Sequence, residues 1–262
     1  MFTNIICEKI DHIYKITINR EKQLNALNKD ILKELDEAID ILNNDEDIFV
    51  GIISGQGRAF VAGADISEMK VMNFEEGRRF SEVGNGIFRK IESSPKPIIA
   101  AINGFCLGGG LELAMSCDIR LASQKAKLGQ VELNLGIIPG FGGTQRLARI
   151  VGIGKAKELI YSAKIIDAME ALNINLVNKV IEEDKLLGEA MNIAKDISIK
   201  GQLAVRYAKI AINQGLDMNI ENGIKFESNL FGMCFASYDQ KEGMEAFLEK
   251  REANFDLYKD VK

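Results

Sequence analysis

The sequence predicts an α/β protein in which short βα units come first and a helical tail follows. Up to Gly152, apolar runs of strand length alternate with segments of helical periodicity. Beyond Gly152, helical segments follow one another, and no linker, repeat or low-complexity stretch separates the two parts. We therefore expect a core over residues 1–183 that carries the active site, and a helical region over residues 184–262.

The first part of the chain shows strand and helix patterns in turn. Residues 4–19 alternate apolar and polar side chains, and the apolar side chains between Ile31 and Leu42 recur at helical spacing. The expected elements are two strands within residues 4–19, a helix over 31–42, a buried strand over 49–54, a long polar helix over 74–93 and a strand over 118–122.

One stretch, PIIAAINGFCLGGGLELAMSCD from Pro97 to Asp118, predicts the centre of a ligand site. An apolar run from Ile98 to Ile102 has strand length, and three successive glycines lead to an apolar helical run with one charge, Glu112. A strand, a glycine turn and a helix N-terminus together form a pocket of backbone N–H groups suited to an anion. A carboxylate among apolar neighbours is costly unless it is paired or protonated. Two plainer interpretations stay open: the glycines only permit tight packing, and Glu112 only complements the helix dipole.

A second carboxylate lies in a similar setting. Glu132 stands between Val131 and Leu133 in the glycine-rich segment LGQVELNLGIIPGFGGTQRL, residues 128–147. On this segment alone a plainer interpretation is favoured, namely a glutamate on a strand edge that points to solvent.

The side chains that the sequence lacks exclude several kinds of catalysis. His12 is the only histidine and falls in a predicted turn, so a Ser-His-Asp triad, a Cys-His pair or a His-ligated metal has no second member. The four cysteines form no C-x-x-C pair and are expected as reduced thiols. Gly154-Lys155 is followed by Ala156, and no G-x-G-x-x-G follows a strand, so phosphate-binding loops are not indicated. We expect no metal, and chemistry that rests on carboxylates and backbone groups.

Length and composition are those of an ordinary globular protein. The 262 residues are 47% hydrophobic and 27% charged, and the formal net charge of −5 gives no electrostatic footprint for nucleic acid or an anionic membrane. No apolar run reaches the ~18 residues of a membrane span, and the N-terminus lacks the regions of a signal peptide. We expect a cytoplasmic protein with neither nucleic acid nor a membrane as a partner.

The helical region has more apolar faces than a small isolated appendage could bury. We expect it to serve assembly between chains, and a tail folded back on its own core is the alternative. The expected helices after Gly152 cover residues 153–163, 167–173, 184–198, 201–214, 219–235 and 239–251.

Five segments in order resemble one family over essentially the whole chain. They are NREKQLNALN, GRAFVAGADISEM, KPIIAAINGFCLGGGLELAMSCDIRLAS, GQVELNLGIIPGFGGTQRL and EGMEAFLEKR. In these segments the chain is similar to the crotonase (enoyl-CoA hydratase/isomerase) family, and within it to the bacterial short-chain enoyl-CoA hydratases. Single glycine clusters are weak signals, but this ordered set is specific.

The resemblance implies both a fold and an assembly. The fold is the crotonase (ClpP-like) spiral of ββα units, with C-terminal helices that build a homotrimer or a homohexamer of two trimers. The substrate is an acyl-CoA thioester, and no separate cofactor is expected because coenzyme A belongs to the substrate.

The resemblance also implies which residues form the site. The oxyanion hole takes one N–H from Ala64 and one from Gly109, and the two hydratase carboxylates fall on Glu112 and Glu132. One departure stands out, because Val131 occupies a position that is often proline in the family. The remaining substrate and CoA contacts would be Ala26, Ala62, Asp65, Ile66, Pro139 and Gly140, with Lys250 either near the CoA phosphates or simply a solvated lysine at a helix end.

These groups suit the addition of water to a trans-2-enoyl thioester. The carbonyl gains negative charge as the α-carbon becomes enolate-like, and two backbone N–H donors stabilise it. Water adds at the β-carbon while a proton reaches the α-carbon on the same face, so one carboxyl group acts as base and the other as acid. Close like charges raise one pKa, which makes a shared proton plausible. We assign water activation to Glu112 and proton delivery to Glu132, and the same groups run the reverse dehydration.

Two other functions are carried as alternatives. An enoyl-CoA isomerase of the same superfamily commonly keeps only one of the two carboxylates. A crotonase-fold protein that binds RNA or acts as a scaffold is the alternative from a different class, and the negative net charge and the acid pair argue against it.

Overall fold

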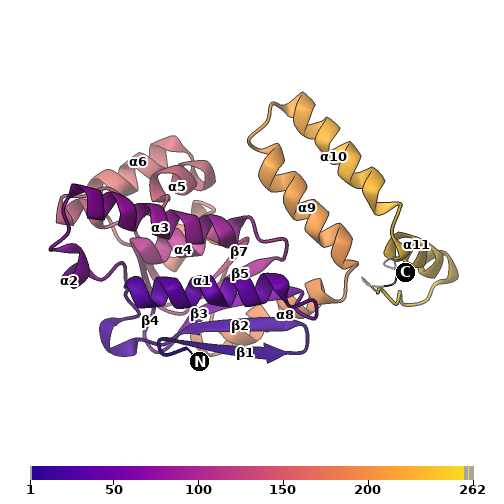
Figure 1. Cartoon of the computed structure of the whole chain (residues 1–262), viewed down its shortest axis with the longest axis horizontal. Helices are drawn as coiled ribbons and strands as arrows, with labels where there is room; N and C mark the ends of the chain where they lie inside the picture. The colour runs from indigo at the N-terminus through magenta and orange to yellow at the C-terminus, as the bar shows by residue number, and fades with distance from the viewer. Residues whose placement is uncertain (1, 257–258, 260–262) are drawn as a thin grey trace.

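The computed structural model describes residues 2–256 and 259, and its core is built on two sheets (Figure 1). The larger sheet has six strands in the order β1-β2-β3-β5-β7-β10, and the smaller has four in the order β4-β6-β8-β9. The larger sheet contains β1 (Ile5–Ile10), β2 (Ile13–Ile18), β3 (Val50–Gly55), β5 (Ile98–Ile102), β7 (Ile119–Ser123) and β10 (Lys179–Ile181). The smaller sheet contains β4 (Ala59–Val61), β6 (Phe105–Leu107), β8 (Lys127–Gly129) and β9 (Ile166–Asp167).

Three successive strand pairs give one strand to each sheet. In the pairs β3/β4, β5/β6 and β7/β8 the first strand joins the larger sheet and the second joins the smaller one. A helical segment follows each pair, so the predicted spiral of ββα units is confirmed. The helices of this part are α1 (Lys29–Asn44), α2 (Ile66–Met69), α3 (Phe74–Glu92), α4 (Gly109–Ser116), α5 (Gly143–Val151), α6 (Ile153–Ser162) and α7 (Ala168–Asn173).

Both faces of the larger sheet are buried at its central strands β3 and β5, as their nearly continuous apolar sequences require. On β5, Ile99 and Ala101 belong to a cluster with α8 (Leu186–Ser198), whereas Ile98, Ala100 and Ile102 face the main core. The helices α1, α3 and α4 cover that second face (Figure 1). Helix α4 packs inside this core and contacts β4 and β6 of the smaller sheet.

The sequence patterns placed the long elements correctly and missed the short ones. The two strands within residues 4–19, the helix over 31–42 and the helix over 74–93 are confirmed. The stretch after Gly152 is largely helical, as the sequence predicts, and it also contains two short strands, β9 and β10, that the sequence does not predict. Three-residue strands such as β6 and β8 leave little local pattern, because they are defined by pairing with distant neighbours. The four cysteines are free thiols.

The division expected at residue 184 falls before a helix that packs on the core. Helix α8 contributes Leu186, Ala190 and Ala194 to one face of the larger sheet. The helices that extend away from the core in Figure 1 begin only at residue 202. They are α9 (Gln202–Gly215), α10 (Ile220–Cys234) and α11 (Tyr238–Glu249).

Helix α9 is fastened to the core by polar side chains. The buried Lys209 ammonium donates to Asp118 Oδ2 at 2.8 Å and to the carbonyl of Lys96 at 3.0 Å. Asn213 donates to the backbone carbonyl of Glu92 at 3.0 Å. The base of the tail is therefore held in a defined position relative to the core. Among residues 2–256 and 259, no helix is both long and apolar enough to cross a membrane.

Candidate active site

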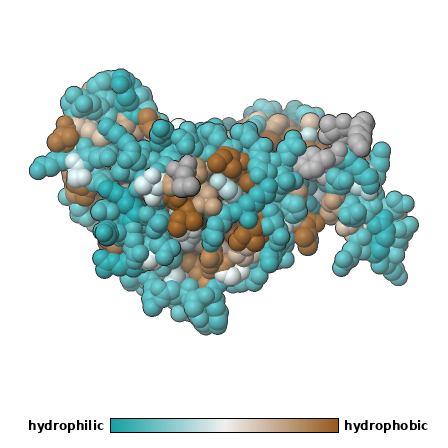
Figure 2. All heavy atoms as spheres, turned by 60° about the horizontal axis from the view of Figure 1, so that its bottom comes forward, coloured by the Kyte–Doolittle hydropathy of each residue, from teal (hydrophilic) through white to brown (hydrophobic). Residues whose placement is uncertain are grey.

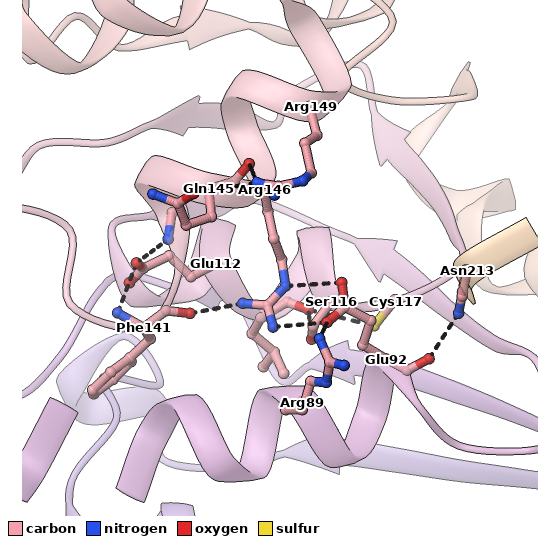
Figure 3. Close-up of polar contacts among 12 residues, drawn as sticks. Arg89, Glu92, Glu112, Ser116, Cys117, Phe141, Gln145, Arg146, Arg149 and Asn213 are labelled. Carbon is pink, nitrogen blue, oxygen red and sulfur yellow. Dashed lines mark hydrogen bonds and ion pairs between the residues drawn. The ribbon is translucent and has the colours of Figure 1, made fainter. Parts of the chain in front are cut away.

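Glu112 is a buried carboxyl group on the first turn of α4. Its side chain is 1% exposed, and Oε1 accepts hydrogen bonds from the N–H of Phe141 at 2.8 Å and of Gly143 at 2.7 Å (Figure 3). Burial and, after it, the nearby Glu132 carboxyl raise the pKa of Glu112 to about 7, although the two N–H donors act to lower it. The carboxyl is thus both fixed in orientation and able to exchange a proton near neutral pH.

Glu132 is the second buried carboxyl, and the interpretation of a solvent-facing glutamate on a strand edge is wrong. It is the first residue of a short 3-10 helix, η2 (Glu132–Leu135), and only 8% of it is exposed. With its amide nitrogen turned toward Glu132, the buried Gln130 donates to Oε1 at 2.8 Å and to Oε2 at 2.9 Å. Burial raises the pKa of Glu132 to about 7.

Glycines bring the two carboxyl groups and the glycine turn together. A Cβ on Gly143 would lie 2.8 Å from Glu112 Oε1 and 2.9 Å from the Gln130 amide, which itself contacts Glu132. A Cβ on Gly108 would lie 3.0 Å from Glu132 Oε1, and its φ of +50° is one that glycine adopts readily. Only a chain without side chains at these positions lets both acids approach the start of α4.

The two predicted oxyanion-hole residues lie on adjoining segments. Ala64 lies between β4 and α2, and Gly109 is the first residue of α4. The residues just before them approach each other, because a Cβ on Gly108 would lie 3.8 Å from the Cα of Gly63. As the first residue of a helix, Gly109 has an N–H with no partner inside that helix. Both predicted donors therefore lie beside the acid pair.

The predicted CoA-binding residues lie on two segments joined by backbone hydrogen bonds. Ala62 N–H donates to Leu24 O at 3.0 Å, and Asp65 N–H donates to Leu27 O at 2.7 Å. Ala26 lies in the first segment, and Ile66 follows the second and is exposed. The structure brings Ala26, Ala62, Asp65 and Ile66 together, although their contact with coenzyme A stays a prediction.

Arg20 is a residue of this region that the sequence patterns did not single out. Its guanidinium donates to Ala26 O at 3.2 Å and to Asp65 Oδ2 at 2.7 Å, so it links the two segments. Hydrogen bonds from Ser67 and Arg20 hold the pKa of the Asp65 carboxyl below its usual range. Asp65 is thus an ionised cap of α2, engaged with protein partners.

Pro139 and Gly140 lie on the loop that leads to the donors of Glu112. Pro139 is buried, and the Gly140 carbonyl accepts from the side chains of Ser81 and Asn85 on α3, the latter at 2.8 Å. Val131 has φ −105°, which lies outside the range that a proline ring imposes.

Lys250 lies apart from this group within one chain. It is exposed and caps the C-terminus of α11, on the tail that extends away from the core (Figure 1). A contact with CoA phosphates on a neighbouring subunit stays a prediction. Among the described residues, no group of three or more His, Cys, Asp and Glu side chains is arranged to hold a metal ion.

Stability is expected to fall as the pH rises through neutrality. A carboxyl whose pKa is raised from 4.5 to about 7 by folding contributes stability that is complete below the unfolded value and lost as pH passes about 7. For Glu112 the difference is on the order of 3 kcal/mol. Calorimetric Tm values at about pH 5 and about pH 8 should therefore differ less in Glu112→Gln than in the wild type. Equal differences in both proteins would contradict the raised pKa.

This arrangement can carry out proton transfer next to a developing negative charge. Two carboxyl groups with pKa values near 7 can hold one proton between them, so one is a base while the other is an acid. The N-terminus of α4 and the adjoining Ala64 segment offer backbone donors for an anionic oxygen.

The sequence and the fold of this chain are both similar to those of known proteins. Residues 8–257 match the family model described as enoyl-CoA hydratase/isomerase. The chain is 54% identical over 249 residues to the short-chain-enoyl-CoA hydratase of Clostridium acetobutylicum, and 95% of each chain is covered. It is 53% identical over 255 residues to the crotonyl-CoA hydratase of Syntrophomonas wolfei, which covers 97% of this chain and 98% of the other. The crystal structure of an enoyl-CoA hydratase from Bacillus anthracis matches with a TM-score of 0.94 at 40% identity, covering 97% of this chain and 100% of that one.

Proposed function

The chain belongs to the enoyl-CoA hydratase/isomerase family, and we propose that it catalyses the reversible syn addition of water to crotonyl-CoA. The product is 3-hydroxybutyryl-CoA, and the same groups dehydrate it in reverse. One observation carries the proposal: Glu112 and Glu132 are both buried beside the same glycine turn. An isomerase commonly keeps only one of these acids, and both similar proteins named above are hydratases.

The thioester carbonyl would be held by backbone groups. Its oxygen would accept from the N–H of Ala64 and of Gly109, which stabilise the negative charge that develops as water attacks the β-carbon. The CoA portion would run along the segments that contain Ala26, Ala62, Asp65 and Ile66. Because these donors belong to the folded backbone, they need not reorganise during the reaction.

The two carboxyl groups would handle the water and the protons. Ionised Glu112 takes a proton from water as the water oxygen bonds to the β-carbon, and protonated Glu132 gives its proton to the α-carbon. The step leaves Glu112 protonated and Glu132 ionised, and transfer of that proton between the two sites restores the starting state. Two N–H donors hold Oε1 of Glu112 in one position, which supports its part as the fixed base.

Turnover with a series of enoyl-CoA thioesters tests the proposal. Purified protein should consume the conjugated double bond of crotonyl-CoA with a kcat/KM that falls as the acyl chain lengthens. A 3-enoyl-CoA should be converted far more slowly, and RNA should not be retained in filter binding at moderate salt. Faster conversion of the 3-enoyl-CoA would favour the isomerase, and RNA binding without turnover would favour the scaffold.

Assembly as a trimer or a pair of trimers is proposed for the helical tail. A set of large apolar side chains lies exposed on the tail. On the face of the molecule that Figure 2 shows, apolar side chains also gather in patches. A cleft of about 1400 Å³ also separates α9 from the core. The exposed apolar residues of the tail include Ile212, Leu216, Ile220, Ile224, Phe231, Met233, Phe247 and Leu248. Large apolar side chains gathered on one exposed element are typical of a surface that binds another protein chain.

Sedimentation velocity is the direct check on assembly. Micromolar protein should sediment as a trimer or hexamer. Replacing Phe247 and Leu248 with serine should shift the distribution toward smaller species, because both side chains are apolar and exposed in the single chain. A wild-type monomer at that concentration would refute the proposal.

We also propose a cytoplasmic location, which the free thiols support.

A further inference from the structure

We infer that Arg146 is a positioning residue for Glu112, acting through the loop that supplies the two N–H donors of that carboxyl. The inference rests on the proposed function and adds a residue to it. Arg146 lies on α5, and its guanidinium donates from Nη1 to the Phe141 carbonyl at 2.8 Å (Figure 3). Its other nitrogens reach the carboxylate of Glu92, Nε at 3.3 Å and Nη2 at 3.2 Å.

Three successive peptide groups of the loop explain why this contact matters. The peptide between Gly140 and Phe141 provides the first N–H for Glu112, and the peptide between Gly142 and Gly143 provides the second. The peptide between them carries the carbonyl that Arg146 binds. Holding the middle peptide fixes the angle between the two donor peptides, so both N–H groups converge on one oxygen.

The loop has other attachments, and they act on its first peptide, on a side chain, or on its third peptide, whose Gly142 carbonyl accepts from the N–H of Gln145 at 3.0 Å and of Arg146 at 2.9 Å. The Gly140 carbonyl is bound by Ser81 and Asn85, and the Phe141 ring packs against Phe80 and Phe88 at centroid distances of 5.1 and 5.5 Å. None of these contacts holds the carbonyl of Phe141. The middle peptide is therefore the point at which losing Arg146 would release the loop.

The guanidinium is itself held in one orientation. Only 11% of the Arg146 side chain is exposed, and its planar fork bridges Phe141 O and Glu92 at the end of α3. Asn213 of α9 binds the backbone carbonyl of the same Glu92. A contiguous path of hydrogen bonds thus joins the base of the helical tail to Glu112, as Figure 3 shows.

Arg146 also contributes charge. The charged groups that act on the Glu112 carboxyl are Glu132, which raises its pKa, and Arg146, which lowers it. Removing the guanidinium should therefore raise the apparent pKa on the acidic side of the pH–rate profile. This readout distinguishes a role at the carboxyl from a general loss of stability.

The test compares Arg146→Gln with Arg149→Gln. Arg149 lies on the same helix and is exposed, and it contacts only Gln145 among the hydrogen bonds of the described chain, so the control removes the same charge. Arg146→Gln should lower kcat for crotonyl-CoA by about 10- to 100-fold with KM nearly unchanged, since small misplacement of a catalytic group has effects of this size. The acidic limb of its pH–rate profile should move to higher pH. Arg149→Gln should match the wild type in kcat, in KM and in the position of that limb.

A conservative variant separates charge from geometry. Arg146→Lys keeps the charge, but a single ammonium cannot reproduce the fork, so its pH profile should return toward the wild type while kcat stays reduced. Full kcat in Arg146→Lys would mean that charge alone matters and would overturn the positioning role. Equal losses of kcat in Arg146→Gln and Arg149→Gln would also overturn it. The same holds if the lower kcat of Arg146→Gln is fully explained by a smaller fraction of folded protein.

A measurement without substrate keeps this inference separate from the proposed function. Infrared titration can follow the Glu112 carboxyl as the difference between a protein and its Glu112→Gln counterpart. The midpoint should lie higher in Arg146→Gln than in the wild type, and an unchanged midpoint would overturn the inference. If the wild type fails to hydrate crotonyl-CoA, the proposed function fails, and this titration still decides the part of Arg146.

Discussion

Glu112→Gln and Glu132→Gln should each lower kcat by about 10²–10⁴, the usual contribution of a general acid or base. The glutamine at position 112 can still accept from Phe141 and Gly143 through Oε1, so shape and hydrogen bonding persist while proton transfer is lost. KM should change little, because the predicted CoA contacts lie on other segments. Steady-state kinetics with crotonyl-CoA measure both quantities, and Tm values no lower than that of the wild type would show that folding is intact.

The double variant tests whether the two acids act in one step. Its loss should fall well short of the product of the single losses, because either change alone already prevents the coupled proton transfers. Losses that multiply would mean that Glu112 and Glu132 act independently. Near wild-type turnover in Glu132→Gln would instead favour a one-acid isomerase.

Gly109→Pro should lower kcat by about 10²–10³, the typical cost of one lost oxyanion donor. Proline removes the N–H that is proposed to bind the thioester oxygen. It is tolerated at the first position of a helix, which Gly109 occupies in α4. The measurement is turnover of crotonyl-CoA, together with circular dichroism to verify that the helices are retained.

Gly109→Ala is the matched control for the proline variant. It adds a Cβ at 3.3 Å from Leu27 Cδ1 and 3.4 Å from Phe141 Cδ2, so it creates the same initial crowding but keeps the N–H. It should lose much less activity than Gly109→Pro. Equal losses in the two variants would show that crowding, and not a missing donor, causes the defect.

The fold was predictable from sequence where a pattern is long enough to be local. Residues of α1 and α3 repeat at helical spacing over several turns, and their ends carry capping side chains, Asn28 and Asn73. The short strands β6, β8, β9 and β10 could not be predicted in this way. Each has two or three residues, and only pairing with a distant strand makes it a strand.

The candidate site was predictable as far as unusual residues mark it. Glu112 and Glu132 stand out because a carboxylate is rare among apolar and glycine-rich neighbours. The sequence does not indicate that Gln130 and Arg146 belong to the site, because a polar residue next to a loop or on an amphipathic helix normally faces water. Their burial depends on contacts with Glu132, Glu92 and Phe141, which only the folded chain creates. The pattern TQRL, which contains Arg146, does not by itself indicate a contact with Phe141 or Glu92.

The strand order of the larger sheet also bears on how the chain is built on the ribosome. In β1-β2-β3-β5-β7-β10 every strand joins the one that precedes it in the sheet, and none has to insert between two that are already paired. The sheet can therefore lengthen at one edge as synthesis proceeds from the N-terminus. Until Lys179–Ile181 emerge, β7 is an open edge that can pair with another nascent chain. A chain whose synthesis stops after η2 would thus hold both acids and still lack the strand that protects it from aggregation.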